Sequence, residues 1–235
     1  MMINPSTVHI WKISTSSEEQ ETYFNLLSKD EKLRANKFRF TKDRKTYVIA
    51  KGVLRVLSGY YLNQKPEQIE FEYSKFEKPK YKNHSRLKFN VSHSGNYIII
   101  GFVNEYDLGV DIEYIKKDFD VLDIADNFFS TSELDALHQI DEKERIRAFY
   151  RCWTRKESFI KAEGSGLSFP LDTFSVTLDT DLEASLLDTQ WSKGEKDKWS
   201  LFSFIPYEGY IAAISVRGVF RDYLYMEWNH SWGFL

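Results

Sequence analysis

The sequence predicts an α+β protein of two lobes, because the same order of elements occurs twice along its 235 residues. Each half begins with a strand-like stretch, continues through short helical stretches to one long helical stretch, and ends with three more strand-like stretches. The repeat is one of element order and not of residue identity. We expect a first lobe at residues 1–105 and a second at residues 106–235, with a small-ligand site in the cleft where the lobes meet.

In the first half, alternation of apolar and polar residues predicts strands at 8–14, 69–73 and 87–92, and an apolar run predicts a buried strand at 97–103. Helical patterns cover about 18–27, 28–38 and 41–62. Ser28 and Glu31 form the S-x-x-E pattern of a capping box at the start of the second helix. Thr41 is the expected N-cap of the third. We expect the stretch 74–86 to form a loop.

In the second half, a strand is predicted at 108–113 and helices at 121–129 and 132–140. Asp141 and Glu144 have the spacing of another capping box, which opens a long helix to about Glu163, and Gly164 is its expected stop. Three more strands are expected near 173–178, 198–205 and 210–216. The single cysteine, Cys152, falls within the long helix without metal-ligand spacing, so we expect a small core residue and no disulfide.

The composition is that of a globular protein, with 42% hydrophobic and 16% aromatic residues. The 18 Phe, 14 Tyr and 6 Trp should build much of the core. No apolar run approaches the ~20 residues of a membrane-spanning helix. The first 14 residues lack the basic and long apolar segments of a signal peptide. We therefore expect a cytoplasmic protein that does not bind membranes.

The charge is unevenly distributed along the chain. A net charge of −3 argues against a general nucleic-acid-binding protein. Residues 29–55, however, hold ten Lys or Arg against three acidic residues, so this segment carries +7 and the remainder −10. A local basic field suits a polyphosphate ligand or an acidic protein partner, and a solvated helical face explains it equally well.

Two acidic residues alternate with apolar ones in Gly109-Val110-Asp111-Ile112-Glu113. In a strand, residues two apart share a face with their Cα atoms roughly 6.5–7 Å apart, so these carboxylates repel each other unless a cation lies between them. A hard divalent cation such as Mg²⁺ fits, because it prefers oxygen ligands. The alternative is a surface strand with its acidic residues in water.

Two other stretches add polar groups. In Phe89-Asn90-Val91-Ser92-His93-Ser94-Gly95, Ser92 and His93 lie at the end of a strand, where they can hold a ligand or where the histidine can be structural. In Trp153–Lys161 of the long helix, Glu157 and Lys161 are four residues apart and face the same way. They form either an ordinary ion pair, or a third carboxylate for the metal with a lysine for phosphate.

Three motifs together resemble the signature of the 4′-phosphopantetheinyl transferases of the surfactin-synthetase-activating type. They are Phe-Asn-Val-Ser-His-Ser at 89–94, Gly-Val-Asp-Ile-Glu at 109–113, and Trp-Thr-Arg-Lys-Glu-Ser at 153–158 with Lys161 following. Their order and separations match that family, and the likeness extends from about Leu27 to Val216. Each motif alone is weak, whereas the three in this order are specific.

The resemblance implies a monomer whose two similar lobes are related by a pseudo-twofold axis. Each lobe would be a small antiparallel sheet packed with a long helix, with coenzyme A bound in the active-site cleft between them. Such enzymes use magnesium and transfer the 4′-phosphopantetheine arm of coenzyme A to a serine of an apo acyl or peptidyl carrier protein. The products are the holo carrier and adenosine 3′,5′-bisphosphate. The carriers can serve fatty-acid, polyketide, nonribosomal-peptide or lysine-related pathways, and the sequence does not choose among them.

By motif position, the resemblance implies that magnesium is held by Asp111, Glu113 and Glu157. Catalytic roles would fall to Asp111, Glu157 and Lys161. Glu157 would act as a base for the serine proton, as a metal ligand, or as both. Lys161 would supply positive charge at the pyrophosphate. Transfer of this kind is phosphoryl chemistry, which depends on positioning and charge neutralisation.

The resemblance also implies the residues that contact coenzyme A. They would be Lys78, Pro79, Asn90, Ser92, His93 and Lys161, with Arg34, Arg44 and Lys45 at the nucleotide phosphates. The chain departs from the family at Thr46, where members carry arginine, and at Glu77, where members often carry glycine before Lys-Pro. Both departures concern the nucleotide contacts and not the three acidic residues.

Two other functional classes fit these residues. One is a different magnesium-dependent enzyme acting on a nucleotide pyrophosphate. The other is a non-catalytic module that binds coenzyme A or a carrier protein. The set of three acidic residues favours catalysis over simple binding, because a binding module has little use for three neighbouring carboxylates.

Overall fold

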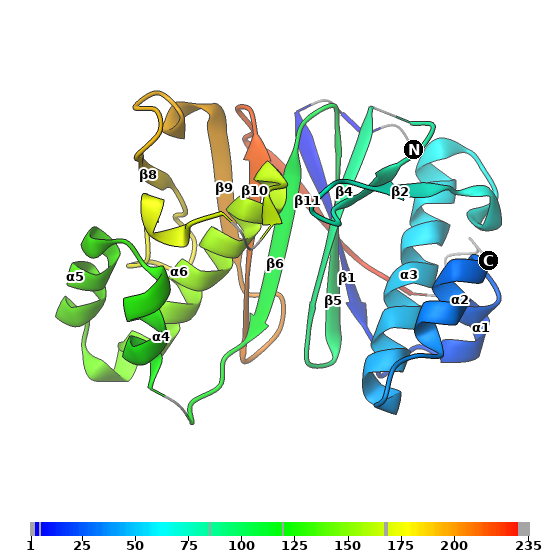
Figure 1. Ribbon diagram of the computed structural model, residues 1–235, viewed down its shortest axis with the longest axis horizontal. Helices are drawn as coiled ribbons and strands as arrows, with labels where there is room; N and C mark the ends of the chain where they lie inside the picture. The colour runs from blue at the N-terminus through cyan, green and yellow to red at the C-terminus, as the bar shows by residue number, and fades with distance from the viewer. Residues whose placement is uncertain (1–2, 5, 85, 119, 167–168, 230–235) are drawn as a thin grey trace.

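The computed structural model describes residues 3–4, 6–84, 86–118, 120–166 and 169–229, and it has two lobes side by side (Figure 1). In the described part of the chain, the first lobe contains three α-helices and six strands. The helices are α1 (Gln20–Phe24), α2 (Lys29–Ala35) and α3 (Thr41–Leu62). The strands are β1 (Thr7–Ser14), β2 (Phe71–Tyr73), β3 (Pro79–Tyr81), β4 (Leu87–Ser94), β5 (Tyr97–Asn104) and the last strand of the chain, β11 (Asp222–Glu227).

The described residues of the second lobe form three more α-helices and five strands. The helices are α4 (Val121–Phe128), α5 (Thr131–Gln139) and α6 (Glu142–Glu163). The strands are β6 (Leu108–Tyr114), β7 (Phe174–Val176), β8 (Leu186–Thr189), β9 (Trp199–Phe204) and β10 (Tyr210–Arg217). The predicted α+β class is confirmed, and each lobe has one helix of 22 residues, α3 or α6. The predicted pseudo-twofold axis stays a prediction.

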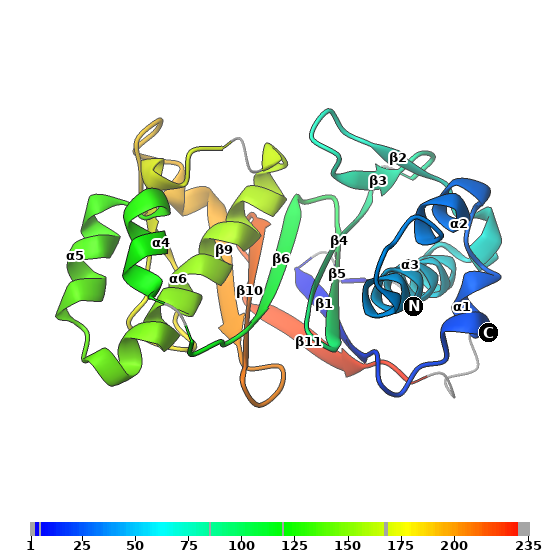
Figure 2. The same cartoon turned by 60° about the horizontal axis from the view of Figure 1, so that its bottom comes forward.

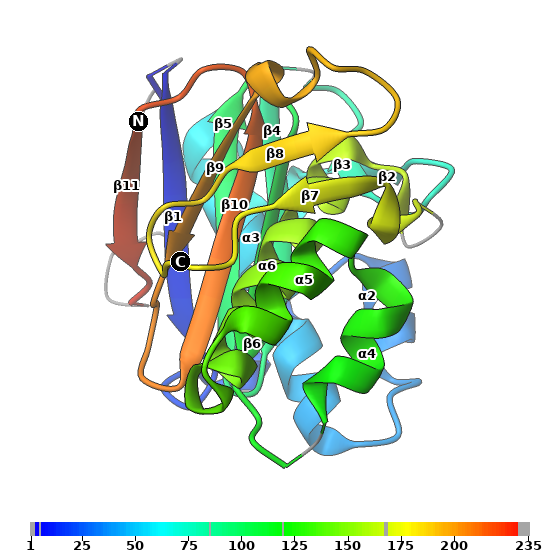
Figure 3. The same ribbon diagram turned by 90° about the vertical axis from the view of Figure 1, so that its left-hand side faces the viewer.

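Each lobe has one main sheet and one hairpin. The strand orders are β11-β1-β5-β4 in the first lobe and β6-β10-β9 in the second, with the hairpins β2–β3 and β7–β8 beside them. All described strand pairs are antiparallel except β1 and β11, which are parallel (Figure 3). Through this pair, the end of the chain completes the sheet of the first lobe. The division at residues 105 and 106 stays a prediction.

The molecule is layered, with a helix outside each main sheet and the two sheets facing each other (Figures 1 and 2). Alternate residues of β1 divide between two cores. Trp11 packs with Leu54 of α3 in the first-lobe core, while Ile10 packs between the sheets with Val110 of β6. A third core lies under α6 and includes Phe159. The lobes therefore share buried apolar surface, and β6 lies at their junction.

Both long helices begin and end close to their predicted positions. α3 covers the predicted 41–62, and α6 ends at Glu163, followed by Gly164 with φ 82°. Two capping predictions are wrong. Thr41 is already the first helical residue of α3, so the N-cap is Phe40, whose side chain has no polar atom to accept a hydrogen bond. Asp141 accepts a hydrogen bond from the backbone N–H of Lys143, so the capping box with Glu144 does not form.

The remaining differences concern short elements. Helix α1 is shorter than the predicted 18–27, and strand β3 lies inside the predicted loop 74–86. Strands β8 and β11 were not predicted. Cys152 is a buried core residue, as predicted. In the described part of the chain, no helix is both long and apolar enough to cross a membrane.

Candidate active site

The acidic residues lie on two touching elements of the second lobe, β6 and α6. β6 carries Asp111 and Glu113, and α6 carries Glu157 and Lys161. Gly109 permits the contact, because a Cβ atom there would lie 2.0 Å from the carbonyl oxygen of Ser158. With no side chain between them, the helix backbone rests directly on the strand. The acidic residues of strand and helix therefore face the same site.

Asp111 is the centre of the hydrogen-bond network at this site. Its side chain is buried, and its Oδ1 atom accepts hydrogen bonds from the Nζ of Lys161 at 2.5 Å and the Oγ of Ser92 at 3.0 Å. Lys161 also donates to Ser92 Oγ, at 3.2 Å. The described ion pairs join Lys161 to Asp111 and not to Glu157, so the alternative of an ordinary pair along the helix is wrong.

The charges around Asp111 change the proton affinities of its neighbours. Burial and the charge of Asp111 raise the pKa of Glu157 to about 7. The same two causes raise the pKa of Glu113 above its ordinary value. Burial lowers the pKa of Lys161, but the attraction of Asp111, Glu157 and Glu113 outweighs this effect and leaves it raised. The site is therefore a cluster of mutually repelling carboxylates that stabilises a positive charge.

These residues fit a divalent cation by their chemistry. The Oδ2 atom of Asp111 is buried and has no hydrogen-bond partner among the described residues. Such an orphaned carboxylate oxygen is costly unless a cation or water satisfies it. Glu113 and Glu157 would complete a set of hard oxygen ligands. Among the described residues, no three or more His, Cys, Asp or Glu side chains are arranged so that they could hold a metal ion, and Asp111 is instead paired with Lys161.

His93 lies near this cluster on the exposed end of β4. Its pKa is lowered by desolvation and by the charge of Lys161, and Asp43 in the first turn of α3 opposes this shift. The start of α3 and the cluster therefore lie within electrostatic reach of the same imidazole. Thr46, one turn along α3, is buried and carries no charge.

The predicted nucleotide-binding cations lie on helices of the first lobe, Arg34 on α2 and Arg44 and Lys45 on α3. Arg34 lies over the ring of Tyr47 at 5.7 Å, and Arg44 lies over the ring of Phe24 at 5.1 Å. Lys45 is half-buried on α3. Phe24 lies in α1, so Arg44 is directed along the helical face of the first lobe. The roles of these three residues stay predictions.

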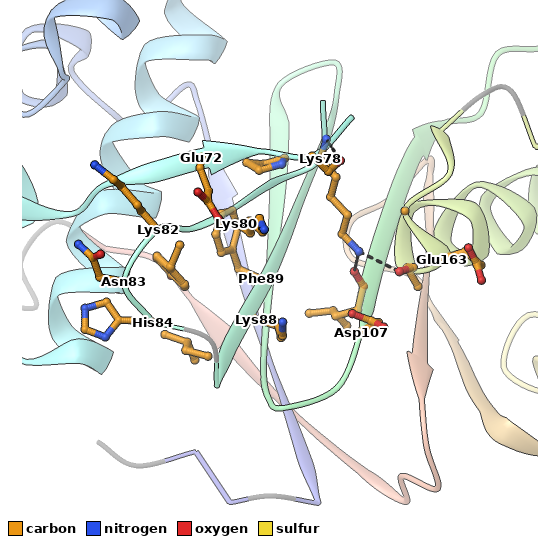
Figure 4. Close-up of a pocket in the computed structure, with 17 residues that line it drawn as sticks. Glu72, Lys78, Lys80, Lys82, Asn83, His84, Lys88, Phe89, Asp107 and Glu163 are labelled. Carbon is orange, nitrogen blue, oxygen red and sulfur yellow. Dashed lines mark hydrogen bonds and ion pairs between the residues drawn. The ribbon is translucent and has the colours of Figure 1, made fainter. Parts of the chain in front are cut away.

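Lys78 connects the two lobes. It lies at the end of the β2–β3 turn, and its Nζ donates to the carbonyl oxygens of Leu108 on β6 and Ala162 on α6, at 3.1 and 2.9 Å (Figure 4). Burial lowers its pKa to about 8. Glu77, just before it, has φ 61°, a left-handed conformation that glycine adopts more easily. This explains in physical terms why glycine suits this position.

Lys78 and Pro79 also line a cavity of about 570 Å³ between the lobes. Its other walls come from the 80–84 segment, the start of β4, Asp107 and the end of α6 (Figure 4). The acidic cluster does not line this cavity, because Asp111 lies further along β6 than the Leu108 wall. The cavity and the cluster are thus separate features of the junction.

Asn90 and Ser94, with Ser92, complete the β4 side of the site. The Oδ1 atom of Asn90 accepts the backbone N–H of Val110, at 2.9 Å. Ser94 was missed among the candidate site residues, although it is two residues from Ser92 and must share its face of the strand. Its hydroxyl donates to Glu113 Oε2, at 3.0 Å. Pro79 is the remaining predicted contact, and it begins β3.

Comparison with known proteins gives the family. Residues 107–215 match the 4′-phosphopantetheinyl transferase superfamily, and residues 11–103 match the 4′-phosphopantetheinyl transferase N-terminal family. The 4′-phosphopantetheinyl transferase HetI of Nostoc sp. is 32% identical over 216 residues, which cover 90% of this chain and 88% of HetI. The 4′-phosphopantetheinyl transferase Sfp of Bacillus subtilis is 36% identical over 172 residues, covering 73% and 75%. The chain therefore belongs to the 4′-phosphopantetheinyl transferase superfamily.

Proposed function

We propose that this protein transfers the 4′-phosphopantetheine arm of coenzyme A to a serine hydroxyl of an apo acyl or peptidyl carrier protein, in a magnesium-dependent reaction. The products are the holo carrier and adenosine 3′,5′-bisphosphate. The observation that carries the proposal is Asp111, a buried carboxylate with one oxygen held by Ser92 and Lys161 and the other without a partner. A mouse relative, the L-aminoadipate-semialdehyde dehydrogenase-phosphopantetheinyl transferase, is 30% identical over 206 residues. The aligned region covers 80% of this chain and 66% of the mouse protein.

Asp111, Glu113 and Glu157 would hold the magnesium ion. When bound, this ion supplies positive charge to the pyrophosphate of coenzyme A, where negative charge develops during transfer. The rise in the pKa of Glu113 and Glu157 supports this role, because carboxylates that repel each other gain most from a cation.

Two residues of this chain would handle the proton and the remaining charge. Glu157, a buried carboxylate of the cluster, can accept the proton of the carrier serine as the serine oxygen attacks the β-phosphate. Lys161 keeps its charge because its pKa is raised, so its ammonium can neutralise a phosphate oxygen. The bond between the β-phosphate and the bridging oxygen then breaks, and adenosine 3′,5′-bisphosphate leaves.

The proposal is tested by incubating the protein with coenzyme A, MgCl₂ and purified apo carrier proteins, and by following each carrier by intact mass. The expected result is a mass gain of one phosphopantetheine that depends on magnesium. Hydrolysis of coenzyme A without any carrier would favour a different pyrophosphate enzyme. Binding of coenzyme A or of a carrier without transfer would favour a non-catalytic module. Comparison among fatty-acid, polyketide and nonribosomal-peptide carriers would define the partner.

Asp111→Asn is the sharpest substitution in this assay. The amide keeps the shape of the side chain but loses the charge that Mg²⁺ needs. Metal stabilisation of phosphoryl transfer is worth several kcal/mol, so the rate should fall at least about a hundredfold. Asp188→Asn is the control, since Asp188 is an exposed aspartate on strand β8. An Asp111→Asn protein that transfers at the wild-type rate would remove the metal assignment.

A further inference from the structure

At the junction of the lobes, the strands that the structure describes lie side by side without main-chain pairing. β4 is an edge of the first-lobe sheet and β6 is an edge of the second-lobe sheet, and the two strands lie beside each other (Figures 1 and 2). In the described part of the chain, main-chain pairing joins β4 to β5 and β6 to β10, and none joins β4 to β6. The N–H groups on the free edge of β6 therefore need other acceptors.

Three side chains of β4 supply these acceptors. Asn90 accepts the N–H of Val110 at 2.9 Å, Ser92 that of Ile112 at 3.4 Å, and Ser94 that of Tyr114 at 3.0 Å. The acceptors lie two residues apart on β4, and the donors lie two residues apart on β6. The repeated spacing fixes the register of one lobe on the other as a main-chain ladder would.

Each serine in this ladder also orients one acidic residue. Ser92 donates to Asp111 Oδ1 and Ser94 donates to Glu113 Oε2, both at 3.0 Å. A hydroxyl has one proton and two lone pairs, so an oxygen that accepts a backbone N–H still has its proton for a carboxylate. In both cases the carboxylate belongs to the residue just before the N–H donor. The same local arrangement therefore occurs twice, one pleat apart.

We propose that Ser94 is a positioning residue for the transfer reaction, because its hydroxyl holds the Glu113 carboxylate toward the metal-binding cluster and fixes the end of β6 against β4. This inference rests on the proposed function, in which Glu113 is a metal ligand. Carboxylates that bind metals are themselves hydrogen-bonded, and loss of such a partner typically costs about 10–100-fold in metal affinity or activity.

Ser94 isolates this role better than Ser92. Ser92 accepts a hydrogen bond from Lys161 as well, so its replacement would disturb the proposed catalytic lysine. The hydrogen bonds of the Ser94 hydroxyl reach Glu113 and the N–H of Tyr114. Its place is fixed by the following turn at Gly95, which has φ 58° and lies against the hydroxyl of Tyr210.

The test compares Ser94→Ala with the isosteric pair Ser94→Thr and Ser94→Val. Thr and Val have nearly the same shape, so the difference between them reports the hydroxyl. Two quantities are measured for each protein: the MgCl₂ concentration that gives half-maximal transfer to an apo carrier, and the rise in melting temperature on adding MgCl₂ without coenzyme A or carrier. We expect Ser94→Ala and Ser94→Val to need at least about tenfold more Mg²⁺ and to lose most of the melting-temperature rise. Ser94→Thr should restore both.

Ser200→Ala is a matched control for the loss of one hydroxyl. Ser200 on β9 also accepts a backbone N–H, from Phe220 at 2.9 Å, and donates to an oxygen, that of Gly218 at 2.8 Å. It lies outside the acidic cluster, so Ser200→Ala should lower the melting temperature slightly and leave the magnesium requirement at the wild-type value.

The outcomes separate the inference from the proposed function. If wild-type protein forms no holo carrier with Mg²⁺, the proposed function fails. If wild-type protein transfers but Ser94→Ala has the wild-type magnesium requirement, Ser94 has a structural role alone and the inference is overturned. Equal magnesium requirements for the Thr and Val variants would overturn it as well, even if either variant is less stable.

Discussion

Glu157 is a buried carboxyl group whose pKa is raised to about 7, first because burial removes water from its charged form and second because Asp111 repels it. In the metal-free protein, the folded state therefore holds this proton more tightly than the unfolded state. A shift from 4.5 to about 7 corresponds to roughly 3 kcal/mol. The contribution of this bound proton to the free energy of unfolding is fully present below pH 4.5 and is lost as the pH rises through 7.

Glu157→Gln should remove this pH dependence. With EDTA present, we expect the variant to gain stability relative to wild type between pH 5 and pH 8, by up to roughly 3 kcal/mol. Urea unfolding at the two pH values, followed by circular dichroism, measures the difference. Glu142→Gln serves as control, because Glu142 is an exposed glutamate at the start of the same helix. If the unfolding free energies of wild type and Glu157→Gln change equally between pH 5 and pH 8, the raised pKa is contradicted. Glu157 would then be ionised in both the folded and the unfolded protein.

The sequence was informative about the acidic residues and less so about their partners. Alternation in β6 and the helical position of Glu157 led to the three carboxylates, because these patterns are local. The partner of Lys161 was not local. Its ammonium bonds Asp111, 50 residues earlier in the chain, rather than Glu157 on its own helix. Contacts of this kind depend on how elements pack, which a single sequence does not record.

At the scale of elements, the site depends on how closely α6 approaches β6. Gly109 lets the helix backbone touch the strand, since a Cβ would lie 2.0 Å from the carbonyl oxygen of Ser158 and 2.3 Å from the backbone nitrogen of Ala162. Both neighbours are backbone atoms and cannot move aside by changing a rotamer. The distance between Asp111 and Lys161 is thus set by a residue that carries no functional group.

Gly109→Ala should separate the two elements. We expect it to destabilise the protein by roughly 3 kcal/mol or more, because overpacking against backbone forces an element to shift. Transfer by the folded fraction should also fall, because the shift moves Lys161 away from Asp111. Gly194→Ala is the matched control, since an added Cβ there meets no atom within 4 Å. Gly109→Ala with unchanged urea midpoint and rate would contradict the close contact.

The helices and strands predicted from the sequence match the structure best where the hydrophobic pattern is long. α3 and α6 span six turns each and were placed within about one residue, because a long periodic stretch averages out exceptions. The missed strands β3 and β8 are three and four residues long, too short for alternation to show. The capping box at Asp141 failed for a different reason. The Asp141 carboxylate can accept a hydrogen bond from the N–H two residues later or from the N–H three residues later. The sequence pattern does not distinguish the two, and in the structure the donor is Lys143.

At the scale of the whole molecule, the chain begins and ends in the same sheet. β11 pairs in parallel with β1, from Thr7 beside Asp222 to Lys12 beside Glu227 (Figure 3). This strand was not predicted, because its partner lies more than 200 residues earlier and none of its own residues is fully buried. The chain therefore crosses the junction of the lobes twice, before β6 and before β11.

Trp228 anchors this returning segment in the first-lobe core. Its side chain is 4% exposed, its indole N–H donates to the hydroxyl of Tyr23 at 2.9 Å, and its ring meets that of Trp11 edge-on at 6.1 Å. Its backbone N–H donates to the carbonyl of Lys12 at 2.8 Å. Trp228, next to the last described residue, is thus part of the core that includes α3.

Trp228→Ala should therefore destabilise the protein by about 3–5 kcal/mol, the usual cost of deleting a buried aromatic side chain. Trp191→Ala is the control of the same residue type, and because Trp191 is 44% exposed on the second lobe, its loss should cost clearly less. Urea unfolding of wild type and both variants, followed by circular dichroism, measures the two costs. Equal and small losses for both variants would show that Trp228 is not required for the core of the first lobe.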